Sequence, residues 1–276
     1  MTAAATRSEP PGLTVVAVEL LGPEPVADLM ADLTETRTTT GACVARATRA
    51  DLDETLPQRR RRGIAAAAEG IVCLVEDTTR LAPGWDAALL DAFGDPSVAL
   101  VSGRVTVDSA LPARFRALGR LEYGRFDSAD PGGDPAGNAF AMRKDLALAC
   151  LDPGEGVIEH ELARRLAARG HRSTRVPGFT AAYVGADRHG AALATRFGHG
   201  RIYGAGRAGS RLVGAARAAL ALPVVVARAF RAARAAGTAR QWLGELPWIV
   251  VLSAAWCTGE FTGQVFGVGT AERSWR

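Results

Sequence analysis

The chain has few cysteines, and none is placed for a metal site or a disulfide framework. Its four cysteines lie far apart in the sequence and form no C-x-x-C pair. Zinc sites and redox pairs need that close spacing, and small secreted domains carry many more cysteines. Most of the four stand among apolar residues, so we expect buried free thiols in a reducing compartment. They are Cys43, Cys73, Cys150 and Cys257.

Long hydrophobic runs are also missing. Residues 1–11 lack the continuous apolar core of a secretory signal, and we expect them to form a disordered lead. The apolar run Leu246–Cys257 has twelve residues, which is too short to span a bilayer by itself. We therefore expect the catalytic part of the chain to be cytoplasmic.

Aromatic residues make up only 6% of the chain, and they do not alternate with the basic residues. Without aromatic platforms or a known reading motif, nucleic acid is excluded as the expected partner. The chain has no Walker loop, and no glycine fingerprint follows the first predicted strand, which disfavours P-loop and dinucleotide-binding proteins. The net charge of +4 is mild. Basic residues concentrate after Arg188, so phosphates or anionic lipid headgroups are expected partners there.

Strands and helices alternate in the first part of the chain. The patterns predict strands at Leu13–Leu20, Thr38–Ala47 and Ile71–Val75, with helices at Pro25–Leu33 and Pro57–Ala68 between them. Such alternation is typical of an α/β protein whose mostly parallel sheet is wrapped by helices. With 276 residues, the chain can bury a large core.

The second part of the predicted sheet domain continues this pattern. We expect a strand at Val98–Val107, within which Gly103 marks a close backbone approach. Helices are expected at Leu111–Phe126 and Glu155–Gly170. A further strand is expected from His171 to Val176, ending at Pro177.

An acidic tip follows the apolar strand Ile71–Val75. It consists of Glu76, Asp77 and Thr78, at the carboxyl end of a strand, where open α/β sheets bind their ligands. The two acids could simply cap the next helix. Alternatively, they hold a hard divalent cation such as Mg or Mn against a diphosphate.

The wider pattern resembles the centre of the family 2 glycosyltransferases, which have the GT-A fold. It consists of a strand, two acids, five residues, Pro83-Gly84-Trp85 and a helix. In that family an Asp-x-Asp motif binds a metal ion and the nucleotide-sugar diphosphate. The resemblance implies that Glu76 and Asp77 bind the cation and donor, with Thr78 beside them. Two positions depart from the family: Thr78 replaces an acid, and Gly185 lies where a metal-binding histidine often stands.

The resemblance also implies residues that bind the donor. Arg60, three residues before Gly63, matches an arginine that lies near the nucleotide, although the arginine run could equally be a solvated helix face. Glu19 is expected to approach the base and ribose. Gly137 and Asn138 match a segment that lines the donor-sugar pocket; the alternative is a plain turn before a helix.

A catalytic base is implied by the same resemblance. In the family, the helix expected here at Glu155–Gly170 carries an acidic base, then a second acid and an Arg-Leu pair. Aligning Arg165-Leu166 places Glu159 at the base position and Glu161 at the second acid. The alternative is that both acids only cap the helix. The mechanism requires Glu159 and the acidic tip to face the same cavity.

Residues 196–207 are basic, glycine-rich and aromatic, and resemble the family's loop after the catalytic core. The resemblance implies that Arg201 neutralises the donor diphosphate there. We divide the chain into a GT-A-like domain at 12–208 and an apolar, basic helical region at 209–276. That region fits helices at a membrane interface, or a hairpin packed on the core or on another subunit of a homo-oligomer. Its interfacial residues would be Arg217, Arg228, Arg231, Arg234, Arg240, Trp242, Trp248 and Trp256.

Together these patterns predict an inverting glycosyltransferase. It would use a nucleotide-diphosphate sugar and a hydroxyl acceptor, which could be lipid-linked if the tail meets the inner face of the cell membrane. The alternative is a catalytically silent GT-A-like protein that binds a nucleotide sugar or lipid and acts as a scaffold. Thr78 and Gly185 favour that alternative.

Overall fold

The computed structural model describes residues 12–36, 42–51, 54–127, 134–185, 191–207, 210–235 and 237–271. In this part of the chain, seven strands form one sheet in the order β2-β1-β3-β6-β5-β7-β4. Strand β6 is antiparallel to both neighbours and β4 is antiparallel to β7, while the other strands run in one direction. The strands are β1 (Leu13–Val18), β2 (Cys43–Ala47), β3 (Ile71–Glu76), β4 (Thr79–Leu81), β5 (Val98–Val107), β6 (Ala139–Arg143) and β7 (Arg172–Tyr183).

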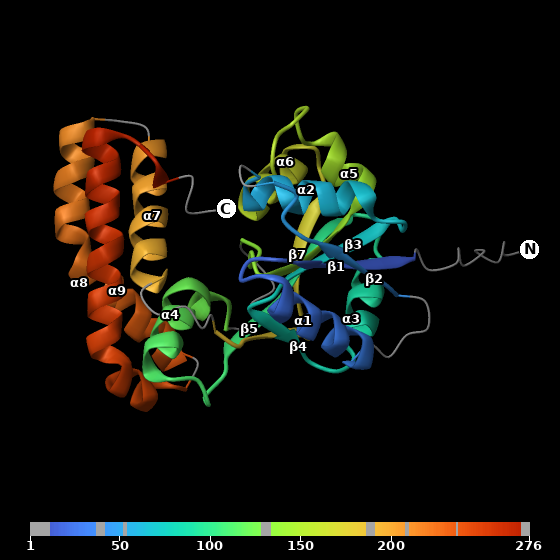
Figure 1. Ribbon diagram of the computed structural model, residues 1–276, viewed down its shortest axis with the longest axis horizontal. Helices are drawn as coiled ribbons and strands as arrows, with labels where there is room; N and C mark the ends of the chain where they lie inside the picture. Colours follow the sequence, from blue (N-terminus) through green and yellow to red (C-terminus); the bar gives the residue numbers. More distant parts are fainter. Residues whose placement is uncertain are drawn as a thin grey trace, which may run out of the picture.

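Helices cover both faces of the sheet (Figure 1). On one face lie α1 (Pro23–Thr36) and α3 (Trp85–Ala92). On the other lie α2 (Leu56–Ala66), α5 (Lys144–Ala149) and α6 (Glu159–Ala168). The expected fold class, a mixed and mostly parallel sheet flanked by helices, is confirmed.

Strand β3 lies inside the sheet, and all its residues are buried. Successive side chains of a strand point to opposite faces. Ile71, Cys73 and Val75 accordingly pack with α1 and α3, whereas Val72 and Leu74 pack with α2, α5 and α6. Burial on both faces explains why the strand is apolar throughout, and the alternation sends the next side chain, at position 76, toward α2.

A layer of helices stands beside the sheet domain, on the left of Figure 1. It contains α7 (Ala191–Gly206), α8 (Arg211–Ala235) and α9 (Ala239–Phe266). Helix α4 (Ala113–Tyr123), followed by the short η1 (Gly124–Phe126), lies between this layer and the sheet. Although α7 precedes residue 209, it packs on α9, and the division into two domains at that residue stays a prediction. The core shared by α4, β7, α8 and α9 contains Ala117, Leu118, Tyr183, Ala229, Ala233, Trp242, Ile249 and Leu252.

Residues 196–206 lie in α7, where the sequence led us to expect a loop, and residue 207 follows the helix. Gly200 and Gly204 of α7 face Gly259 and Gly263 of α9, so each helix presents a G-x-x-x-G pair to the other. A Cβ atom on any of these four glycines would lie less than 3.0 Å from backbone atoms of the partner helix. The glycines therefore allow the two helix backbones to approach closely, and this packing outweighs the low helix propensity of glycine.

Strand β7 is longer than predicted, because it continues past Pro177 to Tyr183. Its register with β5 shifts between the pairs Gly103↔Val176 and Arg104↔Thr180, which leaves residues 177–179 in a bulge. A proline is tolerated in a bulge, where its missing N–H breaks no ladder hydrogen bond. The close approach predicted at Gly103 is confirmed, because an added Cβ would meet the backbone oxygen of Phe179.

Two short strands and one thiol differ from the sequence expectation. Strands β4 and β6 were not predicted. Cys43 is exposed, because β2 is an edge strand with its middle residues partly open to solvent, whereas the other cysteines are buried as expected.

Candidate active site

Glu76 and Arg60 form a buried ion pair at the carboxyl end of β3. Glu76 ends the strand on the α2 side, and the side chains of Glu76 and Arg60 are each only 7% exposed. Arg60 Nη2 donates to Glu76 Oε1 at 2.5 Å. Helix α2 starts with Pro57 in its first turn and with the Thr55 N–H donating to Gln58 Oε1, so Arg60 projects from a well-defined helix start.

The same guanidinium also binds Glu159, the first residue of α6. Arg60 Nη1 donates to Glu159 Oε2 at 3.0 Å, and Nη2 also donates to the carbonyl of Gly137 at 2.9 Å. A Cβ on Gly137 would lie 2.9 Å from the Glu159 carboxyl carbon, so a larger residue would displace that side chain. We call Glu76, Arg60 and Glu159 the Arg60 network. Arg60 thus lies between Glu76 and Glu159. That Glu159 and the acidic tip face the same cavity stays a prediction.

The charges of this network favour the ionised forms of Arg60 and Glu159, whereas burial raises the pKa of Glu76 although Arg60 opposes the rise. Burial by itself would lower the pKa of Arg60, but Glu76 and Glu159 raise it above its ordinary value. Burial would raise the pKa of Glu159, but contacts with His160 and Arg60 and its backbone hydrogen bond lower it to about 2. Glu159 is therefore a carboxylate at neutral pH, and its side chain remains 20% exposed.

Asp77 points to a different part of the site. Its Oδ2 accepts hydrogen bonds from the backbone N–H groups of Leu20 (2.9 Å) and Leu21 (2.8 Å), and thus fixes the turn after β1. Asp77 Oδ1 is buried and has no hydrogen-bond partner. Glu19 lies next to this turn, where its side chain meets Arg46 at 3.8 Å. Glu19 and Asp77 therefore line the carboxyl ends of β1 and β3.

Asn138 and Thr78 are both buried beside Glu76 and Asp77. Asn138 is fully buried. Its side-chain amide donates to Thr79 Oγ1, and its backbone carbonyl accepts a hydrogen bond from the Glu76 N–H. Thr78 is also buried, and its hydroxyl has no partner. Asn138 therefore fixes the strand end in this structure and does not present its amide to solvent.

Two predicted residues lie away from the network. Glu161 binds Arg164 and Arg165 on the outer side of α6. Arg201, on α7, donates to the carbonyl of Gly267 just after α9. The structure thus brings Glu19, Arg60, Glu76, Asp77, Gly137, Asn138 and Glu159 to one end of the sheet, and leaves Glu161 and Arg201 outside this group.

Sequence reasoning missed the contribution of α4 and α7. Glu122 of α4 pairs with Arg196 of α7 at 2.6 Å, and the Arg196 guanidinium stacks 4.4 Å from the Trp256 ring centre. The next residue, Tyr123, packs 5.5 Å from Tyr183 between ring centres. Burial raises the pKa of Tyr123, and the charge of Glu76 adds to the rise, so this tyrosine stands close to the network. The sequence marked the basic stretch of α7, but nothing in it selected Arg196 over Arg201.

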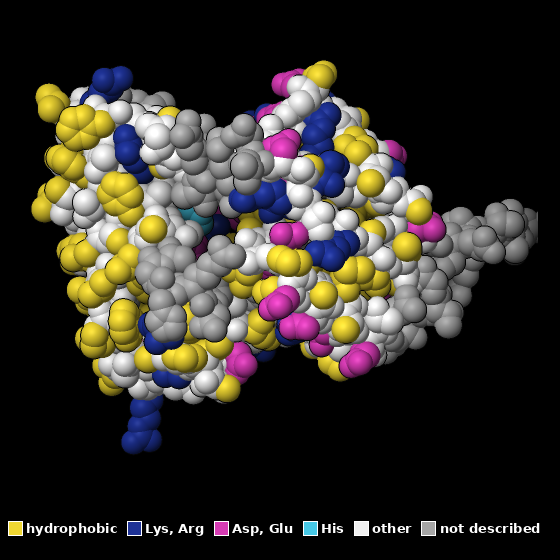
Figure 2. Space-filling view, in the orientation of Figure 1, with side chains coloured by type: hydrophobic (Ala, Val, Ile, Leu, Met, Phe, Trp, Pro, Cys, Tyr) yellow, Lys and Arg dark blue, Asp and Glu magenta, His cyan; other side chains and the backbone are white. Residues whose placement is uncertain are grey.

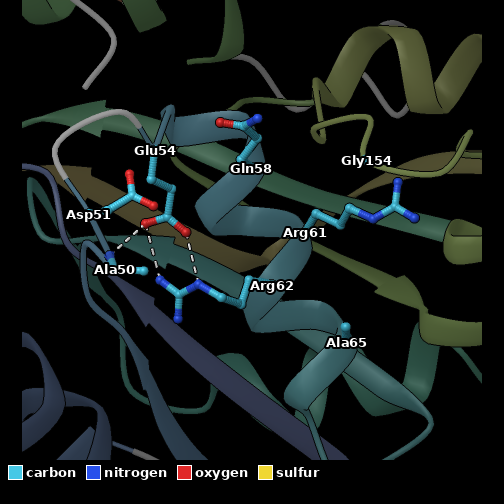
Figure 3. A pocket seen from close by; sticks show the side chains of 8 residues that line it. All are labelled: Ala50, Asp51, Glu54, Gln58, Arg61, Arg62, Ala65 and Gly154. Carbon is cyan, nitrogen blue, oxygen red and sulfur yellow. Dashed lines mark hydrogen bonds and ion pairs between the residues drawn. The ribbon is translucent and has the colours of Figure 1, made fainter.

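An open groove of about 530 Å³ lies on the outer side of α2 (Figure 3). Its charged groups already bind each other or the backbone. Glu54 accepts from the Ala50 N–H and from Arg62, and Arg61 donates to the carbonyl of Glu155. We therefore do not place the site there.

The acidic tip does not fit a cation shared by Glu76 and Asp77. Glu76 is engaged by Arg60 and Asp77 by backbone N–H groups, and the two side chains serve different faces of the sheet. Among the described residues, no cluster of three or more His, Cys, Asp and Glu side chains could hold a metal ion. His189, four residues after Gly185, lies outside the described residues.

Comparisons with known proteins gave matches only among solved structures. No protein-family model matches the chain, and no curated protein matches it. The mannosyltransferase PcManGT from Pyrobaculum calidifontis, in complex with GDP-Man and Mn²⁺, matches with a TM-score of 0.52 and 15% identity, covering 93% of this chain and 87% of that one. GalNAc-T7 with UDP, GalNAc and Mn²⁺ has a TM-score of 0.41 at 14% identity, covering 63% and 43%. Glucosyl-3-phosphoglycerate synthase from Mycobacterium tuberculosis, in complex with phosphoglyceric acid, has 0.41 at 13%, covering 63% and 72%. The first of these similarities shows that the chain has a GT-A-like fold.

Proposed function

We propose that this protein transfers a sugar from a nucleotide-diphosphate sugar to a hydroxyl group of an acceptor. The observation that carries the proposal is the Arg60 network. It places an ionised, partly exposed Glu159 next to the acidic tip of β3, at the strand ends where α/β sheets bind ligands. The GT-A-like fold adds support, because the similar PcManGT is described in complex with a nucleotide sugar.

Glu159 would act as the general base. As a carboxylate it can accept the proton of the acceptor hydroxyl, a role typically worth about 100- to 10,000-fold in rate. The acceptor oxygen would attack the anomeric carbon while the bond to the diphosphate breaks on the opposite side, so the anomeric configuration inverts. Arg60 would hold the Glu159 carboxylate in position for this step. Because the acidic tip does not fit a cation shared by Glu76 and Asp77, no step of this mechanism involves a metal ion.

The proposal is tested by incubating the protein with a panel of nucleotide sugars and measuring nucleoside diphosphate release, with and without Mn²⁺. We expect release from at least one donor, and its loss in Glu159→Gln while donor binding remains. Glu161→Gln is the matched control, because Glu161 lies on the same helix but pairs with Arg164 and Arg165, which are not part of the Arg60 network. Equal activity in Glu159→Gln and the wild type would refute the role of Glu159.

A second candidate function is nucleotide-sugar binding without catalysis. It is favoured by Thr78, which replaces a carboxylate of the family motif, and by the closed state of the network, in which Arg60 fills the space between Glu76 and Glu159. This candidate predicts that a nucleotide sugar binds in a calorimetric titration while no donor of the panel is ever turned over.

We further propose that the helical layer binds the cytoplasmic face of a membrane and that the acceptor is lipid-linked. In the described part of the chain, every large hydrophobic side chain that is exposed belongs to α7, α8 or α9, and Figure 2 shows many apolar side chains along this edge of the molecule. Helices α8 and α9 are also long and apolar enough to cross a membrane. Exposed arginines on α8 and α9 would complement anionic headgroups; they are Arg211, Arg217, Arg228, Arg231, Arg234 and Arg240.

Vesicle sedimentation tests this second proposal. We expect the protein to bind vesicles containing anionic lipid, and the double change Leu212→Glu and Leu220→Glu on the exposed face of α8 to abolish binding. If the wild type stays in solution with every vesicle but sediments as a dimer in the ultracentrifuge, this face binds a second copy of the chain and the membrane proposal is wrong.

A further inference from the structure

Glu76 and Asp77 are adjacent in sequence, but they bind separate parts of the molecule. Glu76 follows Val72 and Leu74 on the α2 face of β3, where Arg60 meets it. Asp77 lies beyond the strand and holds the turn after β1. A cation placed between the two carboxylates would have to break a 2.5 Å contact between Glu76 and a buried arginine. The geometry therefore points to a role for Glu76 that does not involve a metal ion.

Arg60 is held in one orientation by several acceptors. Nη2 donates to Glu76 and to the Gly137 carbonyl, and the guanidinium lies 5.6 Å from the ring centre of Phe140. A guanidinium is planar and rigid, so fixing one of its terminal nitrogens also fixes the other. The position of Nη1, which holds Glu159 Oε2, is thus set by the contacts that Nη2 makes with Glu76 and Gly137.

Glu159 depends on this arrangement more than the other two residues do. It is the first residue of α6 and has the most exposed side chain of the network, at 20% against 7% for Arg60 and Glu76. Arg60 fixes one of its carboxylate oxygens, and its exposure leaves the carboxylate within reach of a substrate. A flexible side chain at a helix start gains a defined direction from such a contact.

We infer that Glu76 is a positioning residue: buried and hydrogen-bonded to Arg60, it orients that guanidinium, and Arg60 in turn orients Glu159. The inference rests on the proposed function, since it assigns Glu76 to the base of the proposed reaction. It also replaces the metal-ligand role that the family resemblance implied for Glu76.

The first test is Glu76→Gln, which keeps the size of the side chain and replaces the carboxyl group with an amide. We expect kcat for the active donor to fall by about 100-fold, the loss typical of a misplaced catalytic group, while KM for the donor changes less than threefold. Mn²⁺ affinity, measured by electron paramagnetic resonance of free Mn²⁺ in the presence of GDP or UDP, should match that of the wild type. A tenfold loss of Mn²⁺ affinity in Glu76→Gln would overturn the inference, because it would make Glu76 a ligand.

Glu54→Gln is the matched control. It removes another buried carboxylate that pairs with α2, through Arg59 at 3.3 Å, without touching Arg60. We expect it to keep the wild-type kcat. A loss equal to that of Glu76→Gln would show that any disturbance of α2 lowers the rate, which would contradict a specific positioning role.

A double-mutant cycle tests whether Glu76 acts through Arg60. Arg60→Lys keeps the charge but cannot hold both carboxylates in the planar geometry of a guanidinium. If Glu76 acts only through Arg60, adding Glu76→Gln to Arg60→Lys lowers kcat no further. Losses that multiply would instead mean that Glu76 touches the substrate or a metal independently. If Glu76→Gln does not fold by circular dichroism, Glu76→Asp takes its place in the same cycle.

These outcomes distinguish a failure of the proposed sugar transfer from a failure of the role inferred for Glu76. If the wild type turns over no donor, the proposed function fails, and the inference about the base fails with it. If the wild type is active but Glu76→Gln keeps its kcat or loses Mn²⁺ affinity, the inference alone fails, and sugar transfer stands.

Discussion

The contact between α7 and α9 gives the most direct prediction for stability. Gly263→Ala adds one methyl group at a point where the two backbones nearly touch. The new Cβ would meet the Arg201 carbonyl oxygen first, and it would lie 2.8 Å from the Ala205 nitrogen and 2.9 Å from the Arg201 carbonyl carbon, whereas ordinary contacts begin at 3.4 Å. The obstacle is main chain and cannot rotate away, so the two helices must move apart.

The magnitude follows from two opposing effects. Overpacking a tight contact typically costs about 1–3 kcal/mol, and a clash with backbone belongs at the upper end of that range. Alanine recovers about 1 kcal/mol through its better helix propensity. We therefore expect Gly263→Ala to lower the free energy of unfolding by about 2 kcal/mol.

Gly244→Ala is the matched control in the same helix. A Cβ at this exposed position meets no atom within 4 Å, so only the propensity gain applies, and we expect stabilisation by about 1 kcal/mol. Both variants are measured by urea unfolding followed by circular dichroism. The reasoning is refuted if Gly263→Ala is as stable as the wild type, or if the two substitutions change stability in the same direction.

Three further predictions concern charges and thiols. Glu245 is fully buried on α9 and pairs with Arg120 of α4 at 2.5 Å, so Glu245→Gln should lower the free energy of unfolding by about 3–5 kcal/mol and open the helical layer to limited proteolysis; unchanged cleavage would contradict this. Burial opposes ionisation of Glu54, but contacts led by Arg62 lower its pKa to about 2. Since this folded pKa lies below the ordinary value of 4.5, the stabilisation that ionised Glu54 contributes is present above pH 4.5 and is lost toward pH 2. In Glu54→Gln, the free energy of unfolding measured in urea should therefore depend less steeply on pH between these two values. Of the four cysteines only Cys43 is exposed, so a thiol reagent should label one thiol per folded chain and four in urea, and rapid labelling of a second would contradict the packing.

Much of the sheet domain could be predicted from sequence because its signals are local. Strand β3 is apolar at every position because it is buried on both faces, and the acids that follow it mark the sheet end. Strand β4 and the continuation of β7 past Pro177 were missed, since one has three residues and the other needs a bulge that only the pairing with β5 reveals. The glycines of α7 led us to expect a loop instead of a helix. Their role becomes clear only from the packing of α7 on the glycines of α9, about sixty residues later in the chain.

The candidate active site, too, could be predicted from the sequence only in part. Matching a family pattern brought Arg60 and Glu159 into consideration, and the structure joins them. What the pattern could not supply is the direction of each side chain. The opposite orientations of Glu76 and Asp77 come from the pleat of β3 and from the turn after β1. Arg196 was missed because its importance depends on Glu122, which is 74 residues away in the chain.

Helix α4 has a practical consequence for anyone who wishes to shorten this protein. One side of it approaches the candidate active site through Tyr123, and the other carries the arginines that hold Glu245. A fragment cut after Val184 would keep the whole sheet but expose Leu118 and leave two guanidinium groups without their counter-charge. Such a fragment would be expected to aggregate or to lose its active-site geometry, so activity assays should begin with a chain that includes α7, α8 and α9.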